Sequence, residues 1–122
     1  MRNSRTKGTT ITQALACVRR RLPPGWTAEE RGGERTGTLT LCGTDRRRAD
    51  FALVVRKGLV PRDVRALVAE TREPTLVISS YLGARARELL AQAGVSYADT
   101  TGNLRLVASS PAIFLEGVGA EK

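Results

Sequence analysis

Three short apolar runs separated by two helix-length segments restrict the fold of this chain more than any other feature. The runs cover residues 49–55, 75–79 and 95–98, and turn residues bound each of them, which is typical of buried strands. One helical pattern starts at Pro61 and ends before Pro74, and the other covers residues 83–93 and ends at Gly94. This alternation favours parallel pairing of the three strands.

The segments on either side complete a predicted mixed sheet. Helical spacing follows Thr10-Ile11-Thr12-Gln13 and stops at Pro23-Pro24-Gly25. Residues 26–31 and 38–41 are predicted strands of an antiparallel meander, and residues 104–108 and 112–115 form a predicted terminal hairpin. We therefore expect an α/β fold, a mixed β-sheet with helices on both faces. It comprises one domain, residues 9–117, between a flexible basic arm, residues 1–8, and a tail, residues 118–122.

The net charge lies entirely in the first half of the sequence. Residues 1–60 contain 13 Lys and Arg against 5 Asp and Glu, whereas residues 61–122 contain 7 of each kind. The whole net charge of +8 therefore belongs to the first half. A one-sided positive field attracts polyanions, above all nucleic acid.

Several function classes are excluded or disfavoured by composition. The chain has no histidine, which excludes a Ser-His-Asp triad, a Cys-His pair and histidine-ligated zinc. Its two cysteines, Cys17 and Cys42, are too few for a disulfide framework and are expected to be reduced. No apolar run is long enough to cross a bilayer, and no apolar segment of a secretory signal follows the basic N-terminus. We expect a cytoplasmic protein that does not bind membranes.

Clustered cations are the candidate nucleic-acid contacts. Two arginine triplets and a further basic pair make up the set, with help expected from residues 2–7: Arg19, Arg20, Arg21, Arg46, Arg47, Arg48, Arg56 and Lys57. No aromatic residue interleaves them, so contacts to the backbone of a duplex fit better than stacking on single strands. The alternative is that these residues form an ordinary solvated surface.

The third predicted strand carries a family resemblance. It reads Ala49-Asp50-Phe51-Ala52-Leu53-Val54-Val55-Arg56-Lys57, within the element order helix, three strands, helix, strand. This order resembles the restriction-endonuclease-like, or PD-(D/E)XK, nucleases, in which acids and a lysine bind a divalent metal and activate water. The resemblance places Lys57 at the motif lysine and Val55 where the motif has an acid. It implies a degenerate site without catalytic residues, metal or cofactor.

A second resemblance covers residues 76–116. The segment includes Leu76-Val77-Ile78-Ser79-Ser80-Tyr81-Leu82 and then Gly94-Val95-Ser96-Tyr97-Ala98-Asp99-Thr100-Thr101-Gly102-Asn103. It resembles a domain of bacterial, especially actinobacterial, regulators and AbiEi-type antitoxin-like proteins. Within this motif Tyr97, Asp99, Gly102 and Asn103 either build a tight turn, for which their residue types suffice, or contact a ligand.

These observations predict a catalytically silent, nuclease-like domain that binds duplex DNA through the phosphate backbone in a regulatory or defence-related role. The first alternative is an active Mg²⁺-dependent nuclease that uses Asp50, Lys57 and an acid such as Glu29 or Glu30. The second alternative is a protein-interaction, antitoxin-like module without DNA binding. A protein partner and a homodimer are both compatible with the sequence.

Overall fold

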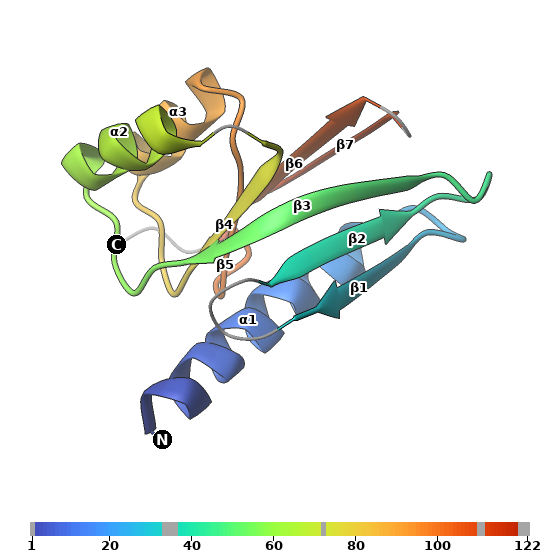
Figure 1. The fold of residues 1–122 in the computed structure, drawn as a ribbon, viewed down its shortest axis with the longest axis horizontal. Coiled ribbons are helices and arrows are strands. Elements are labelled where there is room, and N and C mark those ends of the chain that lie inside the picture. The colour runs from blue at the N-terminus through green and yellow to red at the C-terminus, as the bar shows by residue number, and fades with distance from the viewer. Residues whose placement is uncertain (1, 33–36, 72, 110–111, 120–122) are drawn as a thin grey trace.

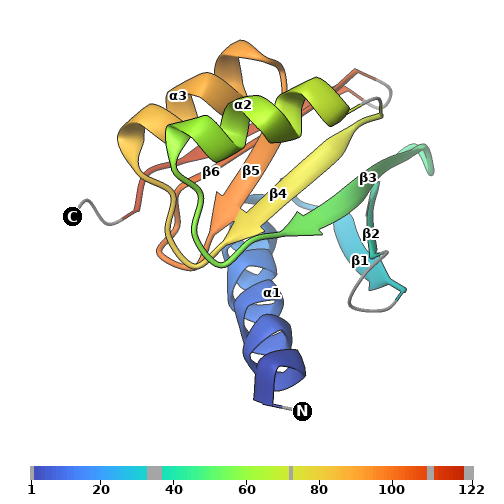
Figure 2. The same cartoon turned by 60° about the vertical axis from the view of Figure 1, so that its left-hand side comes forward.

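The computed structural model contains a single sheet of seven strands that lie in the order of the chain (Figure 1). It describes residues 2–32, 37–71, 73–109 and 112–119, with side chains from residue 10 onward. The elements are α1 (Arg2–Arg21), β1 (Thr27–Arg31), β2 (Thr38–Cys42), β3 (Arg48–Val55), α2 (Pro61–Glu70), β4 (Thr75–Ser79), α3 (Ala84–Gln92), β5 (Ser96–Asp99), β6 (Leu104–Ser109) and β7 (Ala112–Gly117). α1 lies against one face of the sheet, and α2 and α3 cover the other (Figure 2). The predicted mixed sheet with helices on both faces is confirmed.

The centre of the sheet is parallel, as the alternation of strands and helices predicted. β3 pairs with β4 from Ala52↔Thr75 to Val55↔Ile78, and β4 pairs with β5 in parallel as well. All five residues of β4 are buried, because helices cover both of its faces. The carboxyl ends of the three parallel strands therefore lie at one end of the sheet.

Both flanks of the sheet are antiparallel. β1, β2 and β3 form the predicted meander, and β5, β6 and β7 form a second one. The last two strands pair from Leu104↔Gly117 to Ser109↔Ala112. Ser110 and Pro111, predicted to turn this hairpin, lie outside the described residues. The first flank belongs to the basic half of the sequence, so the charge asymmetry of the chain is also an asymmetry in space.

Two apolar cores lie on the two faces of the sheet. The larger core packs α1, through Leu15 and Val18, against residues of all seven strands, including Leu39 of β2 and Phe51 of β3. The smaller one packs α2 and α3 against Val77 of β4 and neighbouring residues of β5. Alternation along β3 explains the division, because its residues 49, 51 and 53 face α1 while Val54 packs with the smaller core.

α1 begins earlier than the sequence predicted. Residues 2–8 were expected to be a flexible arm, but the helix begins at Arg2. The buried residues from Ile11 onward hold the helix on the sheet, and each further residue then adds one backbone hydrogen bond at little cost. No proline interrupts residues 2–8, so the helix extends beyond the sheet, as Figure 2 shows.

Candidate nucleic-acid interface

The fold brings the connection after the first arginine triplet into contact with the loop that carries the second. The connection from α1 to β1 packs on the loop between β2 and β3: a Cβ on Gly25 would lie 2.6 Å from Cγ2 of Thr44, and one on Gly43 would lie 3.2 Å from the ring of Trp26. The first triplet ends α1 just before this contact, and the second follows the loop directly. We call residues 19–21 and 43–48 together the basic end.

A short turn presents the second triplet. The amide of Gly43 donates to the carbonyl of Arg47 at 3.0 Å, and the amide of Arg46 donates to the carbonyl of Gly43 at 3.1 Å. Asp45 stabilises the turn, because its carboxylate accepts the amide of Arg47 at 3.1 Å and pairs with Nε of the same residue at 3.3 Å. Arg46 has a φ of 68°, in the left-handed region. Residues 44–48 are all exposed.

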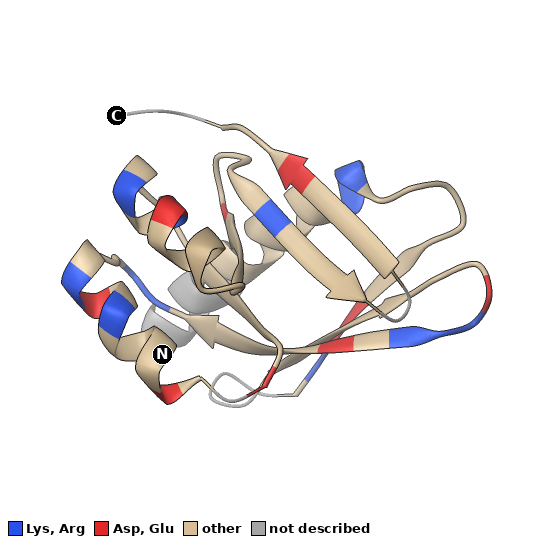
Figure 3. Ribbon diagram, turned by 90° about the horizontal axis from the view of Figure 1, so that it is seen from above, with Lys and Arg blue, Asp and Glu red and all other residues tan. Residues whose placement is uncertain are grey.

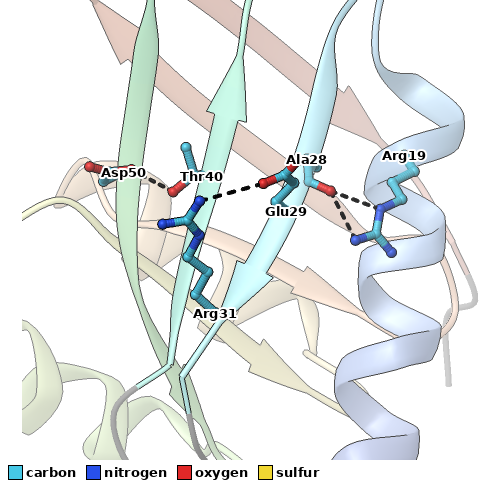
Figure 4. Close-up of polar contacts among 6 residues, drawn as sticks. All are labelled: Arg19, Ala28, Glu29, Arg31, Thr40 and Asp50. Atoms are coloured by element: carbon cyan, nitrogen blue, oxygen red, sulfur yellow. Dashed lines mark hydrogen bonds and ion pairs between the residues drawn. The ribbon is translucent and has the colours of Figure 1, made fainter.

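The first triplet fans out from the last turn of α1, because successive helical residues are 100° apart. Arg19 donates from Nε and Nη2 to the carbonyl of Ala28 in the edge strand β1, at 3.2 and 2.9 Å (Figure 4). Arg20 donates to Sγ of Cys17 at 3.2 Å, and Arg21 lies close to Gly117 of β7. Arg19 is therefore partly structural, since it satisfies a carbonyl that β1 has no strand to pair with.

Few carboxylates offset the charge of the basic end. Asp45 is the only acidic residue in it, against six arginines. The ion pairs between described residues are Arg31–Glu29, Arg47–Asp45 and Arg85–Glu88, and all three are exposed. In Figure 3 acidic and basic positions alternate along the two short helices, α2 and α3. The basic end therefore contains five more arginines than carboxylates.

The third basic group lies at the opposite end of the sheet. Arg48 opens β3, and Arg56 and Lys57 follow the residue that ends it. A strand of eight residues spans about 23 Å at ~3.3 Å per residue. Both side chains are exposed, and the carbonyl of Lys57 accepts the hydroxyl of Ser80 at 3.2 Å. The eight predicted contacts therefore lie in three places: three at the end of α1, three at the start of β3 and in the loop before it, and two beyond the end of β3.

Asp50 does not lie near Lys57. Asp50 is the third residue of β3, so the rise to Val55 alone is about 16 Å and Lys57 lies beyond it. Its carboxylate accepts the hydroxyl of Thr40 at 2.6 Å, and Glu29 occupies the same cross-strand row on β1 (Figure 4). Glu29 itself pairs with Arg31. Within the part of the chain that the structure describes, no three His, Cys, Asp or Glu residues form a metal-binding group.

The turn motif is a dense hydrogen-bond network. The fully buried carboxylate of Asp99 accepts six bonds of 2.7–3.1 Å: from the amides of Leu82, Thr101, Gly102 and Asn103, the hydroxyl of Thr101 and the side-chain amide of Asn103. Gly102 has a φ of 109°, as its residue type predicted. Oδ1 of Asn103 accepts the amide of Gly119 at 2.7 Å, which fixes the start of the predicted tail. These contacts fit the structural interpretation of the motif.

Tyr97 belongs to the smaller core. It is buried beneath α3, and burial raises the pKa of its phenol above the ordinary value, with the cation of Arg87 acting in the opposite direction. The cysteines are both free, with Cys17 buried and Cys42 half-buried. Neither the tyrosine nor the thiols supply an exposed reactive group.

Sequence reasoning missed a cleft beside the interface. The first residues of β3 extend beyond Thr75, where β4 begins, and the last residues of β6 extend beyond Ser96, where β5 begins. These two overhanging strand ends line a cavity of about 400 Å³. Arg48 and Asp50 line one side, and Val107 lines the other. The unequal strand lengths were the one available signal, and strand ends are the least reliable part of such a prediction.

Comparisons with known proteins do not assign this interface: no family model, curated protein or solved structure matches the chain. Among the described residues, no helix has the length and apolar character needed to cross a bilayer.

Proposed function

We propose that this chain binds duplex DNA through the phosphate backbone and does not cleave it, acting as a silent nuclease-like domain in a regulatory or defence-related system. One observation carries the proposal: the two arginine triplets, 25 or more residues apart in the sequence, flank a contact between the connections at Gly25 and Thr44, and Asp45 is the only acid among residues 19–21 and 43–48. A packed domain that only needed solubility would not have to gather its cations in this way.

The chemistry of the basic end suits phosphate. A guanidinium is planar and donates paired hydrogen bonds to two phosphate oxygens, and it is charged at every physiological pH. Arg46, Arg48 and Arg20 take part in no ion pair between described residues, so their charges are available to a polyanion. Each phosphate they neutralise releases condensed counterions, and this release supplies most of the affinity.

The absence of cleavage is supported by β3. The order α1, β1, β2, β3, α2, β4 agrees with a restriction-endonuclease-like core. In such a core the strand that holds Asp50 would need a second acid beside the lysine, and Val55 occupies that position. Asp50 and Lys57 lie too far apart to act on one water molecule.

A protein partner, or a second copy of the chain, is the second candidate. It is favoured by the exposed side chains of Val107 and Phe114, which are direct cross-strand neighbours on β6 and β7. Arg105 lies over the ring of Phe114 at 5.2 Å, which leaves the other side of the ring open. This patch lies on the neutral half of the chain, and the proposed DNA contacts do not include it.

Salt titration of DNA binding tests the proposal. We expect the purified chain to bind a duplex of ~20 base pairs and to lose about tenfold or more of its affinity between ~50 and ~200 mM salt, as expected when several phosphates are neutralised. Fluorescence anisotropy with labelled duplex measures this dependence. No binding at ~50 mM salt would refute the proposal and favour the protein-interaction module.

A further inference from the structure

Arg46 has a backbone conformation that the chain otherwise assigns to glycine. Positive φ angles occur among the described residues at Gly25, Gly32, Gly94 and Gly102, and at one non-glycine residue, Arg46, with a φ of 68°. This left-handed conformation strains a residue that has a Cβ, and glycine or asparagine would relieve the strain. The hydrogen bonds of the three-residue hairpin loop hold Arg46 in this conformation, and residues held in this way cluster at functional sites.

The neighbours of Arg46 fix the direction of the turn without engaging its side chain. Asp45 binds both the amide and the guanidinium of Arg47, so the acid that closes the turn is already paired. Within the described residues, no ion pair or side-chain hydrogen bond involves Arg46. Arg46 is therefore an exposed cation in a hydrogen-bonded turn, and its guanidinium is available to bind an anion.

The hairpin offers DNA a short stretch of exposed side chains. Next to the turn, Leu41 and Ala49 are buried against the core, Gly43 is buried, and the ring of Trp26 packs on it. The major groove is ~12 Å wide and admits a whole two-stranded ribbon. Between the buried Gly43 and Ala49, residues 44–48 form a short exposed ridge. A single side chain from such a ridge suits the minor groove, which is ~6 Å wide.

We infer that Arg46 inserts its guanidinium into the minor groove of the duplex, while its neighbour Arg48 binds a flanking phosphate. This inference rests on the proposed DNA binding and adds a preference to it. The minor groove of A·T tracts is narrow and strongly negative, so an inserted arginine favours such tracts without reading individual bases. The exocyclic N2 amino group of guanine obstructs the floor of the groove and disfavours G·C pairs there.

Three duplexes of equal length test the inference: one with a central A·T tract, one with a G·C tract and one with an I·C tract. Inosine lacks the N2 amino group, so an I·C pair resembles A·T in the minor groove and G·C in the major groove. We expect the wild-type chain to bind the A·T and I·C duplexes about five- to tenfold more tightly than the G·C duplex.

Two matched variants separate the roles of the arginines, since each removes one cation from the same ridge. R46G should lose the preference and bind all three duplexes alike. R48A should bind all three more weakly by a similar factor and keep the preference, with a salt slope lower by about 0.9. Equal binding of the three duplexes by the wild type, grouping of I·C with G·C, or a preference that survives R46G would overturn the inference while DNA binding itself stands. Absence of binding to every duplex would instead refute the proposed function.

Discussion

At the scale of single residues, Asp99 lies at the centre of the densest hydrogen-bond network among the described side chains. Its carboxylate is fully buried, and six donors surround it, four of them backbone amides. A turn that needed only a cap would use one or two such bonds. The network also joins three segments, because Leu82 precedes α3 and Asn103 continues the contacts to Gly119.

Asp99→Ala should therefore destabilise the fold by about 3 kcal/mol or more, since it leaves several buried donors without an acceptor. Asp50→Ala is the matched control, because the exposed carboxylate of Asp50 accepts one hydrogen bond, from Thr40. That control should change the free energy of unfolding by less than about 1 kcal/mol. Chemical denaturation measures both values. If Asp99→Ala kept its stability and lost DNA affinity, the turn would be a binding site.

Arg46→Gly should stabilise the fold by about 0.5–1 kcal/mol. Relief of the left-handed conformation contributes about 1–2 kcal/mol, and the greater freedom of glycine in the unfolded chain offsets part of it. Arg46→Ala is the control, because it removes the same charge and retains the strained φ, so its stability should not rise. Equal melting temperatures for the two variants would show that the backbone at residue 46 is unstrained.

At the scale of elements, the length of β3 is the feature that argues against nuclease activity. The strand is long, it begins at the basic end, and it separates Asp50 from Lys57 by most of its length. We expect that the chain does not cleave duplex, single-stranded or branched DNA in the presence of Mg²⁺ or Mn²⁺. Gel electrophoresis of the incubated DNA measures cleavage. Metal-dependent cleavage that Asp50→Ala abolishes would restore the active-nuclease alternative.

The elements and the direction of strand pairing could be predicted from local patterns, but the residues at which an element begins could not. β4 was evident because five residues between turn signals are apolar enough to be buried on both faces. The start of α1 was missed because Gly8 and polar side chains weaken the helical pattern of residues 2–9. The residues after Thr10 pack against the sheet, and the helix formed there extends toward the N-terminus.

The candidate site shows the same division. The two triplets are plain in the sequence, but the contact of Gly25 with Thr44 joins two connections that local periodicity does not describe. The left-handed Arg46 has no sequence signal, because asparagine or glycine is the usual residue at such a position. The separation of Lys57 from this group follows from strand length and becomes clear once β3 is known to be continuous.

At the scale of the whole molecule, the basic residues of the first half of the chain fall into separate groups. Arg46, Arg47 and Arg48 lie at the start of β3, and the pair Arg56 and Lys57 follows its end, about 23 Å or more away. At ~0.1 M salt the screening length is about 10 Å, so charges at one end act almost independently of a polyanion bound at the other. The two groups can therefore be tested separately by variants that remove equal charge.

The most direct test compares the duplex affinity and salt slope of R46A/R48A with those of R56A/K57A, each pair removing two cations from exposed positions. DNA binding at the basic end predicts that R46A/R48A loses about tenfold or more in affinity at ~100 mM salt, with a salt slope lower by about 2. It also predicts that R56A/K57A stays within about twofold of the wild type. Equal losses for the two variants, or a larger loss for R56A/K57A, would contradict an interface at the basic end.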